Sequence, residues 1–161
     1  MKTTDEKHYC DVLIIGSGIA GLSCAITAAD LGLDVIILNK EQAIEESNTV
    51  YAQGGIIARG NDDSPELLAE DIIQAGDGIS NPEAVKIVAY EGPEMVNDFL
   101  IKKIGVPFSK SGKDEFEYAR EASHSRRRIL HSKDSTGRSI ETALVARVSE
   151  YGNIRTFVDY T

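Results

Sequence analysis

A glycine-rich hexapeptide near the start of the chain has the residue types and spacing of a dinucleotide-binding turn. It consists of Gly16, Ser17, Gly18, Ile19, Ala20 and Gly21, and it follows the apolar run 12–15. Gly16 permits a tight bend, Gly18 lets a pyrophosphate approach the backbone, and Gly21 lets the next helix lie close to the strand. The free N–H groups and positive dipole end of that helix attract phosphate. The alternative is an ordinary glycine-rich turn, which the apolar run before it and the small residues after it disfavour.

The end of the second apolar run lacks the acid that nicotinamide-binding folds usually place there for the ribose. Asn39 and Lys40 occupy this place. The Asn39 amide can bond a hydroxyl without charge, and Lys40 is a candidate for contact with adenine or a phosphate. The alternative for Lys40 is a solvated lysine at a strand end. The missing acid argues against NAD as the ligand.

A segment of small, polar and aromatic residues follows, and its pattern over 45–60 is not that of a regular element. Such a segment can press its backbone against a flat ligand, whereas a plain surface loop would not need Tyr51 and Ala52 beside two glycines. The candidates for this contact are Asn48, Thr49, Val50, Tyr51, Ala52, Gln53, Gly54 and Gly55.

A second polar stretch, 109–128, is long for a loop without a function. It contains Glu121 and His124 and ends in the run 126–128, which is three arginines in an acidic chain. These arginines either form a solvated or salt-bridged cluster or compensate the charge of an anionic ligand, and the sequence leaves both interpretations open. The polar stretch 134–138, which begins the next helix, is a further candidate for contact with an anion or a ring.

The elements that must position these residues begin with a β-α-β unit. We expect a strand at 10–15 that is buried on both faces, a helix at 19–31 and a second buried strand at 34–38. A right-handed crossover places the two strands side by side and parallel. The inner side of the helix is expected at Leu22, Ala25, Ile26 and Ala29. The fold class is therefore α/β with a parallel, Rossmann-like sheet.

Helices dominate the middle of the predicted fold. Ser64 and Asn81 each precede a proline, which is the signal of a capped helix start. The pair 92–93 is expected to break or kink the second of these helices, and a further helical piece stops at Gly105. A last helix carries Ile140, Leu144, Val145 and Val148, and a strand begins at 154.

Composition limits the classes of partner. The 161 residues carry a net charge of −9, which argues against nucleic acid or an anionic membrane as a partner. No apolar run has the length of a membrane span. Cys10 and Cys24 have no metal-ligand spacing and are interpreted as reduced thiols of a cytoplasmic protein. We expect no metal site.

Taken together, these segments resemble the flavoprotein family of succinate dehydrogenase and fumarate reductase. The resemblance runs from Cys10 to the end and rests on the ordered motifs 11–18, 51–55, 121–131 and 136–138. It implies a Rossmann-like FAD-binding domain, with residues 17–20 on the pyrophosphate, Lys40 near the adenosine and 48–55 along the flavin. It also implies non-covalent FAD, because the respiratory members bond the flavin covalently through a histidine where this chain has Asn48.

Within this family the chain looks like the members that oxidise L-aspartate to iminoaspartate in NAD biosynthesis. The resemblance implies oxygen or fumarate as electron acceptor and a quinolinate synthase acting downstream. It suggests Glu121 as the residue that recognises the substrate amino group, with a surface ion pair to the neighbouring arginines as the alternative. Succinate dehydrogenase or fumarate reductase activity, or a non-catalytic FAD-binding fragment, are the competing interpretations.

Family members are much longer than this chain. We expect residues 1–9 to be a flexible N-terminal segment and residues 10–161 to be the N-terminal part of the FAD-binding domain. The cap domain, the C-terminal helices and the catalytic arginine are expected beyond Thr161.

Overall fold

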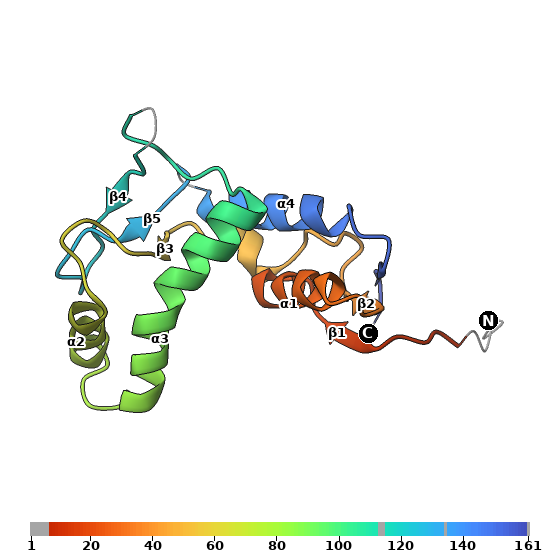
Figure 1. Cartoon of the computed structure of the whole chain (residues 1–161), viewed down its shortest axis with the longest axis horizontal. Coiled ribbons are helices and arrows are strands. Elements are labelled where there is room, and N and C mark those ends of the chain that lie inside the picture. The colour runs from red at the N-terminus through yellow and green to blue at the C-terminus, as the bar shows by residue number, and fades with distance from the viewer. Residues whose placement is uncertain (1–6, 113–114, 134, 161) are drawn as a thin grey trace. The chain divides into compact units, whose positions relative to one another are not determined.

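The computed structural model describes residues 7–112, 115–133 and 135–160, which belong to two compact units. The first unit joins the chain up to Asn48 with the chain from Leu144 onward, and the second spans Thr49–Ala143. Figure 1 shows the elements of both units along the chain.

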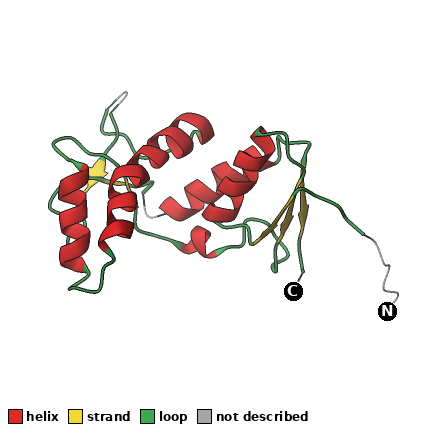
Figure 2. Ribbon diagram, turned by 60° about the horizontal axis from the view of Figure 1, so that its bottom comes forward, coloured by secondary structure: helices red, strands yellow, loops and turns green. Residues whose placement is uncertain are grey.

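The first unit contains the predicted β-α-β arrangement. Strands β1 (Val12–Ile15), β2 (Val35–Leu38) and β6 (Ile154–Phe157) form a parallel sheet in the order β1-β2-β6. Figure 2 shows its strands next to one another. Helix α1 (Ile19–Asp30) connects β1 to β2. The α1 side chains expected on its inner side are all buried, namely Leu22, Ala25, Ile26 and Ala29. The α/β fold class is confirmed.

Burial of the first strand differs from expectation. Ile14 faces α1, since a Cβ on Gly21 would lie 3.3 Å from its Cγ2 atom. Leu13 and Ile15 point to the opposite face, where they are 54% and 84% exposed. The prediction of a strand buried on both faces is therefore wrong for β1, because α1 covers one face only. The strand also begins at Val12 and not at Cys10.

The residues just before β1 contact β6. The His8 ring lies 4.6 Å from that of Phe157, and the Tyr9 carbonyl accepts a hydrogen bond from the Arg155 guanidinium. A flexible segment was expected at residues 1–9. Residues 1–6 of this segment lie outside the described residues.

The second unit has two capped helices that pack side by side, α2 (Pro65–Ala75) and α3 (Pro82–Met95). The hydroxyl oxygen of Ser64 accepts from the Leu67 N–H at 3.3 Å. The Asn81 side chain accepts from the first N–H groups of α3. Both predicted helix starts are confirmed, because each cap satisfies donors that the helix itself leaves free.

The proline inside α3 does not end the helix as expected. The chain continues through Pro93 to Met95 and then into the π-helical turn η2 (Val96–Ile104). Proline lacks the N–H that would bond the carbonyl one turn earlier, which is that of Ala89. The Arg59 guanidinium donates to this carbonyl at 3.1 Å. A side chain from another segment therefore replaces the missing backbone hydrogen bond.

A small antiparallel sheet completes the second unit. Strands β3 (Ile56–Ile57), β5 (Ile129–Leu130) and β4 (Tyr118–Ala119) pair in the order β3-β5-β4. The segments 45–60 and 109–128, expected to be irregular, therefore contain short strands, and the first also contains the 3₁₀ turn η1 (Asn48–Tyr51). Two-residue strands are too short to show a period in the sequence.

The predicted last helix is α4 (Thr136–Val148), which leads to β6. Of its four apolar residues at helical spacing, Ile140, Leu144 and Val148 are buried and Val145 is half-buried. None of the described helices is long and apolar enough to cross a membrane. Within the described residues, no group of acidic, histidine and cysteine side chains has the arrangement of a metal site.

Candidate functional site

The glycine turn has the geometry that its spacing predicts at two of its three glycines. Gly16 has φ +101°, and its N–H donates to the Leu38 carbonyl at 2.8 Å. A Cβ on Gly21 would lie 2.1 Å from the Gly16 carbonyl oxygen, so only glycine fits there. Gly18 is the extended N-cap of α1 and, as a glycine, has no side chain that could cap the helix. The turn therefore leads directly into the N-terminus of a helix, whose positive dipole end suits a pyrophosphate.

Two polar side chains beside the turn are buried and have partners within the first unit. The Ser17 hydroxyl donates to the Ile44 carbonyl at 2.6 Å, and the Asn39 amide donates to the Ala43 carbonyl at 2.7 Å. Both side chains thus fix the segment after β2. Contact of Ser17 or Asn39 with a cofactor remains a prediction, and their buried side chains favour contact through backbone atoms.

Lys40 lies at the surface of the first unit. Its side chain is 74% exposed, and its Nζ atom lies 3.5 Å from Glu41 Oε1. An exposed pair of this kind contributes little to stability and leaves the ammonium group accessible. Contact of Lys40 with the adenosine part of a nucleotide remains a prediction.

Asn48 is the last residue of the first stretch of chain in the first unit, and it is exposed. Its contact with a flavin remains a prediction.

The predicted flat-ligand segment of the second unit is exposed along 51–55, and Thr49 and Val50 are half-buried. Close packing holds its backbone in place. A Cβ on Gly55 would lie 2.1 Å from Ile129 Cγ2, so the chain is pressed against β5 there. The Gly137 N–H, in the first turn of α4, donates to the Ala52 carbonyl at 2.9 Å. One backbone N–H of the stretch 134–138, the predicted contact for an anion or a ring, is therefore used within the protein. Residue 134 itself lies outside the described residues.

Glu121 is brought to this segment from far along the chain. A Cβ on Gly54 would lie 3.4 Å from the Glu121 Oε1 atom, so the carboxylate is adjacent to the glycine pair. The residue is exposed, and within the described part of the chain it forms no ion pair with an arginine. The arrangement supplies an accessible negative charge beside an exposed backbone segment.

The three consecutive arginines have different environments. Arg128 is fully buried and forms two bonds with the Asp63 carboxylate and one with Asp71, at 2.6–3.0 Å. Arg126 and Arg127 are exposed and donate to the carbonyls of Asp62 and Tyr118. The salt-bridge interpretation therefore holds for Arg128. The other two remain available at the surface.

The sequence family described as the FAD binding domain matches residues 11–161. This chain belongs to the FAD-binding-domain family. FAD is accordingly the cofactor that the glycine turn fits, and the resemblance of the sequence to this class of flavoprotein is confirmed.

The FAD-binding domain described here is similar to proteins named L-aspartate oxidase. It is 44% identical to that of Vibrio cholerae over 93% of this chain and 28% of the relative. It is 42% identical to that of Halobacterium salinarum over 89% of this chain and 28% of the relative. The chain thus spans little more than a quarter of the length of these relatives.

A solved structure with the same fold is that of the Mycobacterium smegmatis Sdh1 complex in the apo form. The TM-score is 0.87 at 26% identity, over 96% of this chain and 28% of that chain. The likeness places the FAD-binding domain in the succinate dehydrogenase and fumarate reductase fold, as the sequence motifs predicted.

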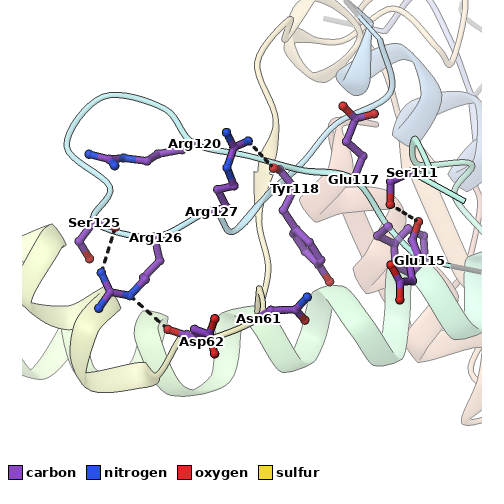
Figure 3. A pocket seen from close by; sticks show the side chains of 11 residues that line it. Asn61, Asp62, Ser111, Glu115, Glu117, Tyr118, Arg120, Ser125, Arg126 and Arg127 are labelled. Atoms are coloured by element: carbon purple, nitrogen blue, oxygen red, sulfur yellow. Dashed lines mark hydrogen bonds between the residues drawn. The ribbon is translucent and has the colours of Figure 1, made fainter.

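A hollow of about 770 Å³ opens beside the β4 strand of the FAD-binding domain (Figure 3). Its charged lining combines three arginines with three carboxylates. Because these charges balance, the hollow does not have the excess of positive charge that an anion site needs. These residues are Arg120, Arg126, Arg127, Asp62, Glu115 and Glu117. Burial raises the pKa of Tyr118, so its phenol on the same wall stays protonated at neutral pH.

Asp71 is a buried residue of the FAD-binding domain that sequence reasoning missed. Its Oδ2 atom accepts from the Ser125 N–H, the Ser125 hydroxyl and Arg128 Nη1, at 2.8, 2.9 and 2.6 Å. Burial opposes ionisation, but the bonds from Ser125 and Arg128 prevail and lower the pKa of Asp71. Its position one turn after the buried Leu68 of α2 was the signal in the sequence, since a carboxylate on an apolar helix face needs a partner.

Proposed function

We propose that the full-length protein containing this domain is an FAD-dependent L-aspartate oxidase, which converts L-aspartate to iminoaspartate. The relatives bearing this name are 42–44% identical to the domain over the aligned residues, which make up 28% of each relative. The observation that carries the proposal is the exposed Glu121 carboxylate beside Gly54. Aspartate differs from succinate by an α-ammonium group, and a carboxylate is a natural partner for that charge.

The residues of this chain have separable parts in the proposed reaction. The turn 16–21 binds the pyrophosphate through backbone N–H groups, with Lys40 near the adenosine and residues 48–55 along the flavin. When bound, FAD supplies the electron-accepting chemistry. Glu121 binds and orients the ammonium group of L-aspartate. The arginine that the family uses in catalysis is expected outside this chain, so the arginines at 126–128 are not assigned that role.

The second candidate is a flavoprotein of succinate dehydrogenase or fumarate reductase, which the TM-score of 0.87 to the Sdh1 complex favours. Two observations support the oxidase instead. The oxidases are 42–44% identical to the domain, whereas the Sdh1 chain is 26% identical. Asn48 cannot form the covalent flavin bond that the resemblance ascribes to a histidine in the respiratory enzymes.

The remaining proposals concern the context of the reaction. Oxygen or fumarate is the final electron acceptor, and a quinolinate synthase consumes the iminoaspartate in NAD biosynthesis. The acidic composition and the absence of a membrane-spanning helix among the described residues are compatible with the proposed cytoplasmic location.

The test of the proposed function is a substrate comparison with purified full-length holoprotein. We expect hydrogen peroxide and iminoaspartate from L-aspartate under air, and no comparable rate with succinate. Oxidation of succinate at a rate equal to or above that of L-aspartate would show the respiratory function instead.

A further inference from the structure

The turn that carries Glu121 is held in an uncommon backbone conformation. It spans residues 121–125, and the His124 N–H donates to the Glu121 carbonyl at 3.3 Å. Ser123 within it has φ +69°, a conformation that residues other than glycine keep only where surrounding contacts impose it. The position of the Glu121 carboxylate therefore depends on whatever fixes the 121–125 turn.

Asp71 fixes the far end of this turn. One oxygen of its carboxylate accepts both the backbone N–H and the hydroxyl of Ser125, at 2.8 and 2.9 Å. Because the carboxylate lies on helix α2, the turn is tied to a rigid element 54 residues away in sequence. A double hydrogen bond from one residue to one oxygen restrains both its position and its χ1 angle.

The buried Arg128 and the half-buried Arg59 make this anchor electrically neutral. Arg128 bonds Asp71 and Asp63 together, and Arg59 Nη1 lies 3.9 Å from Asp63. Two arginines thus balance two aspartates, which allows an ionised carboxylate to remain under the turn. Arg128 also approaches His124 Nδ1 at 3.3 Å, and because a guanidinium only donates, that nitrogen accepts.

We propose that Asp71 is a positioning residue that, through Ser125, holds Glu121 beside Gly54 and so sets the preference for an amino-bearing substrate. The inference rests on the proposed role of Glu121 and deepens it. Asp71 is buried beneath the turn, so it acts through the turn and not by contact with substrate.

The first experiment measures the turn itself. In full-length holoprotein, Asp71→Asn removes the negative charge that attracts the Ser125 donors, and we expect amide hydrogen exchange in peptides covering 121–125 to accelerate about tenfold. Glu70→Gln, at an exposed neighbouring position of α2, removes the same charge without touching the turn and serves as the control. Unchanged exchange in Asp71→Asn would overturn the proposal.

The second experiment is a double-mutant cycle on substrate preference. We expect Asp71→Asn to lower the ratio of kcat/KM for L-aspartate to that for fumarate about tenfold, and to lower it no further in a Glu121→Gln background. An equal fall in both backgrounds, or equal losses on both substrates, would assign Asp71 a structural role only. If Glu121→Gln leaves the ratio unchanged, the proposed role of Glu121 itself fails, and this inference with it.

A milder variant covers the case in which Asp71→Asn does not fold. Ser125→Ala deletes the hydroxyl bond and leaves the Asp71–Arg128 pair intact. It should shift the substrate ratio and the hydrogen exchange in the same direction, by roughly threefold. A folded Ser125→Ala protein with both values unchanged would overturn the proposal.

Discussion

At the residue scale, Glu121 is the group on which substrate choice is expected to depend. Glu121→Gln in full-length protein should lower kcat/KM for L-aspartate about ten- to a hundredfold more than kcat/KM for fumarate, since a charge-assisted hydrogen bond is lost with one substrate only. The measurement is steady-state kinetics on both substrates. Glu117→Gln, an exposed carboxylate of the same segment, is the matched control. Equal losses on both substrates would show that Glu121 does not recognise the amino group.

Gly18 is the residue on which cofactor binding is expected to depend. In Gly18→Val the new side chain would occupy the space of the pyrophosphate at the N-terminus of α1, so full-length protein should purify without flavin. The visible absorption of the folded protein measures the flavin content. A folded, yellow Gly18→Val protein with normal flavin content would rule out this binding mode.

Asn48 is the residue on which the mode of flavin attachment is expected to depend. Because an amide cannot form the covalent bond, acid precipitation of full-length holoprotein should leave all the yellow colour in the supernatant. The absorbance of pellet and supernatant is the measurement. Flavin that stays with the pellet would contradict non-covalent binding and favour a respiratory-type attachment.

At the scale of elements, the helix starts at Ser64 and Asn81 follow from capping chemistry within a few residues. The continuation of α3 through Pro93 does not, because it depends on Arg59 from another segment. The short strands of the antiparallel sheet were also beyond sequence reasoning. Ile57 and Ile129 pair across 72 positions, and neither segment is long enough to show a strand period.

The contact between Arg59 and α3 allows a test in which one mutation offsets another. Arg59→Met should accelerate hydrogen exchange around Pro93 in α3 about tenfold, because the buried Ala89 carbonyl loses its donor. Pro93→Ala restores a backbone N–H to the same carbonyl, so Arg59→Met should have little effect in that background. Hydrogen exchange of α3 peptides by mass spectrometry measures both. An equal effect in the two backgrounds would show that Arg59 acts through Asp63 and not through the helix.

At the scale of the whole molecule, the chain covers little more than a quarter of the oxidases it resembles. It carries the glycine turn, the segment 48–55 that is predicted to lie along the flavin, and Glu121, whereas the family's cap domain and catalytic arginine are expected elsewhere. A site without its cap does not exclude water or orient substrate.

We therefore expect the isolated 161-residue chain to bind FAD weakly and to release no hydrogen peroxide with L-aspartate. Fluorescence titration with FAD and a peroxidase-coupled assay measure the two properties, with full-length protein as the positive control. Peroxide release by the isolated chain would show that one part of the protein suffices for the chemistry.

The sequence by itself determined the β1–α1–β2 unit, the glycine turn, the capped helices and the flavoprotein family. These features depend on signals that act over a few residues. The hydrophobic period predicts a strand or a helix, and a cap satisfies donors two or three residues away. Gly16 is required by its positive φ, and Gly21 by its close approach to the Gly16 carbonyl five residues earlier. Local chemistry of this kind is fully present in the order of the residues.

Only the tertiary structure decided which of the three arginines is buried, where Glu121 lies and which residue holds it. Arg128 differs from Arg126 and Arg127 because its side chain meets two aspartates that lie 57 and 65 positions earlier in the chain. The approach of Glu121 to Gly54 likewise depends on the pairing of β5 with β3 and β4, and on the anchor at Asp71. The energy of such contacts comes from burial and from charge pairing at a distance along the chain, which no local pattern of residues encodes.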